Sequence, residues 1–289
     1  MDAKYSSHFP RPASCSILVF MRRLAILLLL AATAKAGTFA LLVGVSQYAK
    51  LPPDLWLQYP DADVRAFGEF LKSPRGGGVP ASAIRTLTNE QATTAAVREA
   101  FGGFFSAAGA GDTVYILVAA HGTVDSTGAY VLTHDSDPAD LAGSALPMGE
   151  LRALVERTTS HAGRVILLVD VCRAAAIAGQ KTTSLGGVVE KIGEVQGELL
   201  GLMAARPREL SSEGPEFGGG HGAFTWAVLK ALDGAADTDK DGFVSAGELV
   251  DYVTAEVPNL TGGRQHPRDM GTMENGSRLA DLSLAGPVR

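Results

Sequence analysis

The run Arg-Val-Ile-Leu-Leu-Val-Asp-Val-Cys (residues 164–172) predicts the class of fold, because a largely apolar run of this length is typical of a strand buried on both faces of a parallel sheet. A second run, Thr-Val-Tyr-Ile-Leu-Val-Ala-Ala (residues 113–120), ends directly before His121-Gly122. Parallel strands bring their carboxyl ends to one edge of the sheet, where open α/β sheets bind ligands. A thiol and an imidazole that meet at this edge indicate a cysteine hydrolase.

The rest of the chain alternates apolar runs with helical patterns, which predicts an α/β fold with a mainly parallel central sheet and helices on both faces. The polar, Gly-rich stretch 206–220 is predicted to be a loop, and the tail after Pro258 to be irregular. Further strands are predicted at residues 38–45, 84–87, 128–132 and 198–205, and helices at 61–71, 93–108, 147–157, 224–232 and 247–257.

Residues 1–36 are predicted to be a leader, with a signal peptide at 21–36, followed by one catalytic domain over 37–289. Met21-Arg22-Arg23 is basic, residues 24–32 are apolar but short for a bilayer span, and Ala34-Lys35-Ala36 supplies the small residues of a cleavage site. The protein is therefore expected to be exported, to the periplasm or the outside. The alternative is a signal anchor that stays attached.

The number and positions of the cysteines limit the chemistry that is possible. Cys15 lies before the predicted cleavage site, so Cys172 remains alone and forms no internal disulfide. A lone cysteine is often a buried, inert residue, but its position two residues after Asp170 at a strand end favours reactivity.

The composition, with 46% hydrophobic and 19% charged residues, indicates a well-buried globular protein. Residues 1–36 contribute +4 to the net charge of −6, so the remainder carries −10. This acidity argues against nucleic acid and anionic membranes as partners, and it suits basic substrates or calcium. We expect a monomer without stable membrane association after signal cleavage.

A twelve-residue stretch near the C-terminus, residues 237–248, fits the EF-hand calcium loop at every ligand position, with Gly242 at the sharp turn and predicted helices on both sides. The alternative is an acidic turn that binds nothing. We expect one Ca²⁺ site of weak affinity and structural role. Its oxygen ligands would come from Asp237, Asp239, Asp241, the Phe243 carbonyl, Ser245 and Glu248.

The two strand-end motifs, His121-Gly122 and Asp170-x-Cys172, lie about fifty residues apart, which matches the caspase spacing. Together with Ala-Leu-Leu-Val-Gly-Val-Ser-x-Tyr at 40–48, Ser-Ser-Glu at 211–213 and Gly-Ala-Phe-Thr at 222–225, they resemble the caspase-like cysteine peptidases, especially bacterial metacaspase-like (orthocaspase) members. The resemblance covers residues 38–271 and implies a three-layer caspase-like fold. The chain departs from the family at Ala119-Ala120, where Ser-Gly is usual, and at Arg173-Ala174.

The resemblance implies a Cys172–His121 dyad in an endopeptidase. Cys172 would attack as a thiolate, His121 would protonate the departing amine, and the N–H groups of Gly122 and Cys172 would face the oxyanion. Asp63 matches an acidic position that metacaspases use for basic side chains. With Asp170 it favours protein or peptide substrates that present Arg or Lys at the cleavage position. The alternative for Asp63 is an acid at a helix N-terminus.

Two other functions fit the same residues. One is a catalytically silent member of this fold that acts as a binding or scaffold protein, which the alanines at 119, 120 and 174 favour. The other is a calcium-dependent structural protein in which Cys172 only packs.

Overall fold

The computed structural model describes residues 36–173, 198–206, 209–271 and 283–287. It does not describe the side chains of Cys172 and Arg173. The predicted signal peptide and Ala174 lie outside the described residues. Among the described residues, no helix is long and apolar enough to cross a bilayer.

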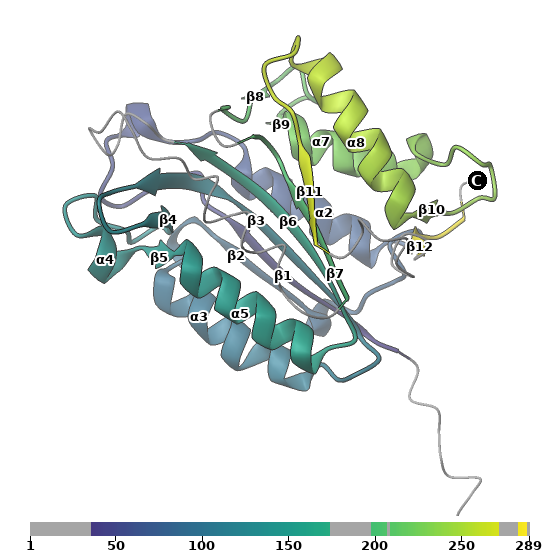
Figure 1. Cartoon of the computed structure of the whole chain (residues 1–289), viewed down its shortest axis with the longest axis horizontal. Coiled ribbons are helices and arrows are strands. Elements are labelled where there is room, and N and C mark those ends of the chain that lie inside the picture. The colour runs from purple at the N-terminus through teal and green to yellow at the C-terminus, as the bar shows by residue number, and fades with distance from the viewer. Residues whose placement is uncertain (1–35, 174–197, 207–208, 272–282, 288–289) are drawn as a thin grey trace, which may run out of the picture. The chain divides into compact units, whose positions relative to one another are not determined.

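The central sheet has eight strands, and its main path runs in the order β11-β7-β6-β3-β1-β2 (Figure 1). The strands from β7 to β2 are parallel to one another, while β11 pairs antiparallel with β7 at one edge and β4 antiparallel with β3. This confirms the predicted α/β class with a mainly parallel sheet. The strand bounds are β1 Thr38–Gly44, β2 Ile84–Thr88, β3 Thr113–Val124, β4 Ala129–Val131, β5 Leu146–Pro147, β6 Arg164–Arg173, β7 Glu198–Met203 and β11 Arg268–Gly271.

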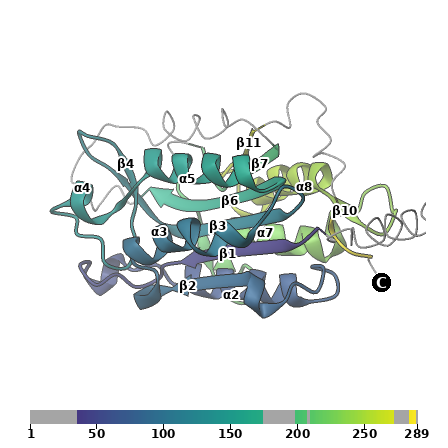
Figure 2. The ribbon, with the colours of Figure 1, turned by 90° about the horizontal axis from the view of Figure 1, so that it is seen from below.

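Helices cover both faces of the sheet and make three layers (Figure 2). One face carries α3 and α5, and the other carries α2, α7 and α8. The helices are α2 Pro60–Lys72, α3 Thr94–Gly102, α4 Leu141–Ser144, α5 Met148–His161, α7 Ala223–Lys230 and α8 Ala246–Leu260.

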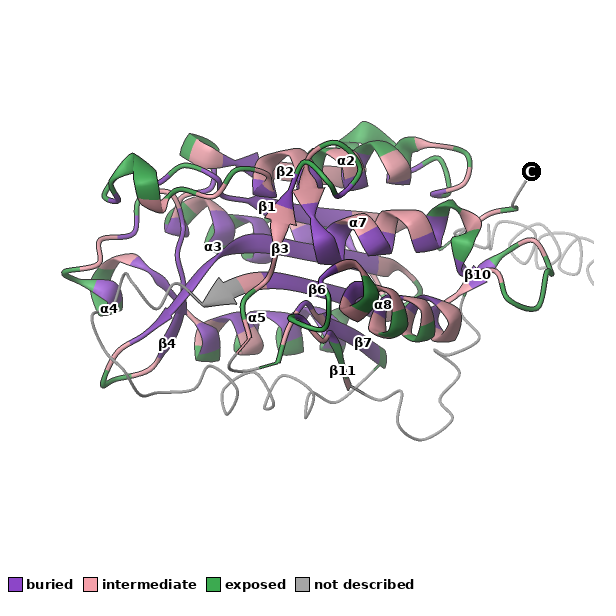
Figure 3. Cartoon of the chain, turned by 90° about the horizontal axis from the view of Figure 1, so that it is seen from above, coloured by how far each residue is buried: buried purple, intermediate pink, exposed green. Residues whose placement is uncertain are grey.

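The strands are buried on both faces because alternate side chains enter two separate cores. In β1, Leu41 and Val43 pack with the α3 and α5 layer, whereas Ala40 and Leu42 pack with the α2, α7 and α8 layer. Figure 3 shows the same pattern, with buried strands between helices that are buried on one side only. This double burial explains why the strands appear in the sequence as continuous apolar runs.

Several predicted boundaries were wrong. The predicted strand 113–120 continues to Val124 because β4 pairs with its end, and the predicted helix 93–108 breaks at Gly103 into α3 and a 3₁₀ turn. The tail after Pro258 is not irregular, since α8 continues through Pro258 to Leu260 and β11 follows. The predicted loop 206–220 contains the short strand β8 Glu213–Gly214, which forms a hairpin with β9 His221–Gly222 directly after the loop.

The path of the chain predicts a crevice at the carboxyl ends of β1 and β3. After β1 the chain passes through α2 to the edge strand β2, then crosses back through α3 on the other face to β3. Connections that leave neighbouring strands on opposite faces open a ligand-binding crevice between them. The segment after β1, residues 45–59, and the ends of β3 and β6 therefore border the site.

Candidate active site

His121 and Cys172 are register partners on the adjacent parallel strands β3 and β6. Partners in a parallel ladder have neighbouring α carbons, and their side chains leave the same face of the sheet. The side chain of Cys172 lies outside the described part of the structure. The backbone therefore brings together the two residues predicted to form the dyad.

The backbone and ring of His121 are fixed by the segment that follows β1. The His121 ring stacks on Tyr48, with centroids 5.1 Å apart. The backbone N–H of His121 donates to the Tyr48 hydroxyl at 2.7 Å. That hydroxyl donates in turn to the Val45 carbonyl at 3.0 Å. The imidazole is only 8% exposed, so this packing restricts its rotation.

The tautomer of His121 follows from its contact with a carbonyl. Nε2 lies 2.7 Å from the Leu55 carbonyl oxygen, which can only accept a hydrogen bond, so Nε2 carries the proton. In the neutral ring Nδ1 is then the free base, and it has no hydrogen-bond partner among the described residues. Burial lowers the pKa of His121, and the bond to Leu55 only partly opposes this effect. The neutral form, with a basic Nδ1, is thus favoured at neutral pH.

Gly122, a predicted oxyanion donor, lies inside β3 and not in a loop beyond it. Its register partners are Val131 on β4 and Arg173 on β6. The oxyanion role of Gly122 therefore concerns the backbone of a strand residue next to His121.

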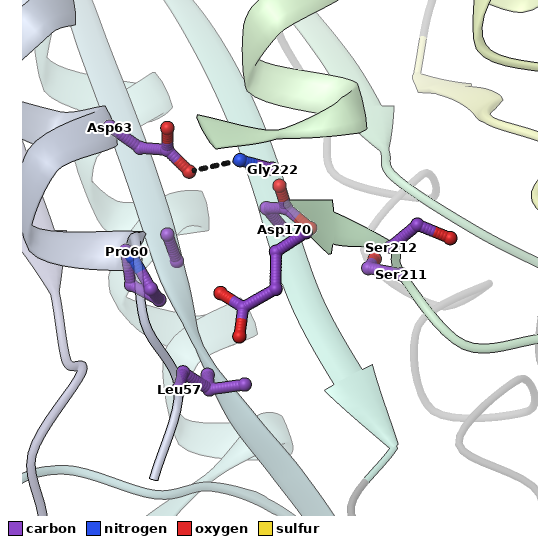
Figure 4. Close-up of a pocket in the computed structure, with 9 residues that line it drawn as sticks. Leu57, Pro60, Asp63, Asp170, Ser211, Ser212 and Gly222 are labelled. Carbon is purple, nitrogen blue, oxygen red and sulfur yellow. Dashed lines mark hydrogen bonds between the residues drawn. The ribbon is translucent and has the colours of Figure 1, made fainter. Parts of the chain in front are cut away.

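Asp63 from α2 and Asp170 from β6 line one pocket beside the dyad, although they are far apart in sequence (Figure 4). The pocket encloses about 270 Å³ of empty space, part of which is open to solvent. Its lining consists of Leu57, Pro60, Asp63, Ala119, Asp170, Ser211, Ser212, Glu213 and Gly222.

The two aspartates are buried, with 2% exposure for Asp63 and 7% for Asp170. Asp63 accepts hydrogen bonds from His221 Nδ1 at 2.6 Å and from the Gly222 N–H at 3.1 Å. Burial raises the pKa of Asp63 even though these donors oppose the shift. Burial first, and then the charge of Asp63, raise the pKa of Asp170 to about 7, against the lowering effect of the Ser211 and Thr225 hydroxyls.

Two residues of this site were missed in the sequence analysis. Glu213 is a third carboxylate of the pocket, and it accepts the N–H groups of Gln58 and Tyr59 at 3.0–3.1 Å. His221 is held between the Asp63 carboxylate and the Trp226 ring, with ring centroids 5.7 Å apart. The sequence signals for their roles were the Ser-Ser-Glu motif at 211–213, which contains Glu213, and the place of His221 directly before Gly222. The hairpin that carries both residues is too short to show a strand pattern.

The predicted calcium loop forms a tight acidic turn. Lys240 and Gly242 have positive φ values of 61° and 91°. Oxygen atoms of Asp237, Asp239 and Glu248 lie within 4.8 Å of one another. Val244 and Ser245 pair with β12 Ser283–Ala285, which attaches the end of the described chain to this loop.

The donor set of this loop suits calcium, which prefers several oxygen ligands. Asp237 Oδ1 is a buried oxygen without a hydrogen-bond partner among the described residues. Glu248 Oε1 accepts the Thr238 N–H at 2.8 Å, and Oε2 accepts the Ser245 N–H at 2.9 Å in a capping box that starts α8. Ionised carboxylates keep further lone pairs for a cation, so these bonds orient Glu248 without excluding a metal.

The comparisons with known proteins agree with this fold. The caspase-domain family model matches residues 38–274, so the chain belongs to the caspase-domain peptidase family. This confirms the family resemblance that the strand-end motifs predicted.

One similar solved structure is a crystal structure of a protein from Geobacter sulfurreducens, with a TM-score of 0.57 at 17% identity. The match covers 88% of this chain and 100% of that chain, and at this identity it concerns the fold alone. A search of curated proteins finds no match.

Proposed function

We propose that the protein is an exported cysteine endopeptidase with a Cys172–His121 dyad that cleaves peptides after Arg or Lys. One observation carries the proposal: the dyad residues are register partners at the carboxyl ends of β3 and β6, beside a pocket lined by buried carboxylates. The match to the caspase-domain family supports the reaction class.

The orientation of His121 suits proton transfer in peptide cleavage. Because Leu55 holds Nε2 as the donor, Nδ1 takes the thiol proton of Cys172. The thiolate attacks the carbonyl carbon, a C–S bond forms, and the C–N bond breaks as His121 gives the proton to the amine. Water then attacks the thioester, releases the carboxylate and returns the proton to the sulfur.

The oxyanion that forms during both attacks needs N–H donors. We assign this role to the backbone of Gly122 and Cys172, whose contribution per donor is roughly 3–4 kcal/mol in comparable sites.

The pocket gives the preference for basic side chains. A cationic side chain that enters it would meet Asp63, Asp170 and Glu213, while no lysine or arginine of the described residues forms an ion pair with these three carboxylates. A buried carboxylate without a cationic partner favours a cationic ligand, and it disfavours the acidic side chains that other caspases accept.

We further propose one structural Ca²⁺ in the loop 237–248, held by Asp237, Asp239, Asp241, the Phe243 carbonyl, Ser245 and Glu248. Its attachment to both α8 and β12 supports a structural role, because an ion there would fix the start of α8 against the end of the chain.

The proposal is tested with fluorogenic peptides that end in Arg, Lys or Asp. We expect cleavage after Arg or Lys, and loss of at least about 1000-fold in Cys172→Ala and His121→Ala. His161→Ala, at the exposed end of α5, is the matched control and should keep full activity. Preferential cleavage after Asp would refute the pocket assignment.

A thiol-directed probe separates an enzyme from a silent member of the family. We expect rapid labelling of Cys172 that slows strongly in His121→Ala and is unchanged in His161→Ala. A protein that neither cleaves any peptide nor labels rapidly would be a scaffold and not a peptidase.

A further inference from the structure

The two aspartates of the pocket are close enough to influence each other directly. A methyl carbon built on Gly222 would lie 2.9 Å from Asp170 Oδ2 and 3.1 Å from Asp63 Oδ2, so both oxygens border the same small space. Gly222 has an ordinary φ of −69°, so the backbone conformation does not require a glycine at this position. The small space between the two carboxylates does. The lack of a side chain lets the two carboxylates converge.

Few groups compensate the charge of this pair. Asp170 receives a hydroxyl hydrogen bond from Thr225 at 3.3 Å and interacts with Ser211, and both are neutral groups. Asp63 has His221 on its far oxygen. Glu213, on β8, adds a third negative charge to the pocket.

The remaining titratable neighbours are Asp61, which lies in the first turn of α2 and raises the pKa of Asp63, and the two residues of the dyad. Cys172 lies two residues beyond Asp170 on β6, and its register partner His121 is on β3. A thiol carries no positive charge, and burial favours the neutral form of His121 at neutral pH. Neither residue therefore supplies a cation to the two aspartates.

Two buried carboxylates whose oxygens border the same small space, with neutral donors on one side, do not both ionise easily. The pair is stabilised either by one proton or by one external cation. Since burial and Asp63 together raise the pKa of Asp170 to about 7, a proton is available to the pair near neutral pH.

We propose that Asp63 and Asp170 hold one proton between them when no ligand is bound, and that an entering lysine or arginine side chain displaces this proton into solvent. This inference rests on the proposed preference for basic side chains. It adds that recognition is an exchange of one positive charge for another, so that substrate affinity depends on pH through the pocket and not only through the dyad.

The test measures binding without turnover. The full chain carrying Cys172→Ala, which removes the thiol titration, is titrated by calorimetry with Nα-acetyl-arginine methylamide in two buffers of different ionisation enthalpy. At pH 6 we expect release of one proton per ligand bound, and at pH 8.5 almost none. The dissociation constant should rise about tenfold for each pH unit below 7.

Two substitutions locate the proton. Asp170→Asn, added to Cys172→Ala, should abolish proton release and the pH dependence of binding, and Asp63→Asn should do the same. Glu216→Gln is the matched control, because it removes an exposed carboxylate outside the pocket lining and should keep the release of one proton. Loss of release in Glu216→Gln alone would overturn the assignment to the pair.

The outcomes distinguish this inference from the proposed specificity. The uncharged citrulline analogue should bind weakly at every pH. If the arginine ligand binds equally at pH 6 and pH 8.5 without proton release, the exchange is refuted and the preference for basic side chains stands. If it binds at no pH, or no better than the citrulline analogue, both are refuted. The buffer comparison uses the intact pocket, so it decides the question even where a pocket variant fails to fold.

Discussion

Two acidic regions of this protein use the same residue types in opposite ways. In the pocket, Asp63 and Asp170 are buried and Asp170 has a pKa raised to about 7. In the loop 237–248, burial of Glu248 is slight, and the N–H and hydroxyl groups of Ser245 and Thr238 lower its pKa to about 2. Burial and the supply of backbone donors, more than residue type, decide how readily a carboxylate carries its charge.

Because of this difference, the pocket and the loop are suited to different cations. The pocket has few donors and a pair of buried carboxylates, which suits the exchange proposed above, in which a single organic cation replaces one proton. The loop has a glutamate, Glu248, whose pKa is lowered, and oxygens of Glu248, Asp237 and Asp239 already lie within 4.8 Å of one another. Such a set suits a divalent ion with several oxygen ligands.

We expect the pocket and the loop to differ most in how a lost carboxylate changes enzyme activity. Asp170→Asn should lower kcat/KM for Arg and Lys peptides on the order of 100-fold, because a buried charge that pairs with substrate is worth roughly 3 kcal/mol. Asp241→Asn makes the same chemical change in the exposed loop, and at saturating calcium it should leave kcat/KM within about twofold. Equal losses in both variants would mean that the loop also shapes the active site.

Calcium binding is expected to change the stability of the protein, and this effect is the next in size. At a calcium concentration 100 times the dissociation constant, binding should add about 2.7 kcal/mol to the free energy of unfolding and raise the melting temperature by roughly 5–10 °C. Glu248→Gln should abolish the rise, whereas Asp251→Asn, an exposed change on the same helix, should preserve it. A wild-type melting curve that calcium leaves unchanged would remove the metal from the proposal.

The sequence predicted the class of fold because its signal is periodic and strong. The doubly buried strands gave continuous apolar runs, and the two strand-end motifs located His121 and Cys172 on neighbouring strands. Asp63 was named from the family resemblance, and its convergence with Asp170 on one pocket depends on the path of α2, which no local pattern encodes.

The missed features share a physical reason. The β8–β9 hairpin and β11 are specified by contacts with distant segments, such as the bonds of Glu213 to Gln58 and Tyr59 and the pairing of β11 with β7. The extension of β3 to Val124 likewise depends on β4, which pairs with it only after the chain has turned. Short elements held by tertiary contacts carry little propensity of their own.

Opposite pKa shifts predict opposite pH dependences of stability in calcium-free solution. The folded-state pKa of Asp170 is above its ordinary value, so its contribution to the free energy of unfolding should fall as pH rises from about 4 to about 7, by at most about 1.4 kcal/mol per pH unit. The folded-state pKa of Glu248 is below its ordinary value, so its contribution should be lost as pH falls from about 4.5 towards 2.

Urea denaturation across this pH range measures both slopes. Asp170→Asn should flatten the curve between pH 4 and 7 and raise stability at pH 8, while Glu248→Gln should flatten only the acidic limb. A wild-type curve that rises steadily from pH 4 to 8, unchanged by Asp170→Asn, would contradict the raised pKa.

The smallest expected effects come from two glycines that serve the two regions for different reasons. Gly222 has an ordinary backbone conformation but no room for a methyl group between Asp63 and Asp170. Gly242 has open space around it but a φ of 91°, which other residues rarely adopt. Gly242→Ala should therefore lower the free energy of unfolding by roughly 1 kcal/mol and weaken calcium binding, with no change in KM.

Gly222→Ala should instead raise KM for basic peptides severalfold, because the methyl group pushes apart the two carboxylates that receive the cation, and it should change the melting temperature little since the backbone is unstrained. Steady-state kinetics and melting curves on the two variants measure both effects. If Gly222→Ala lowers the melting temperature as much as Gly242→Ala and leaves KM unchanged, the glycine serves packing alone. The convergence of the two carboxylates would then have no part in substrate recognition.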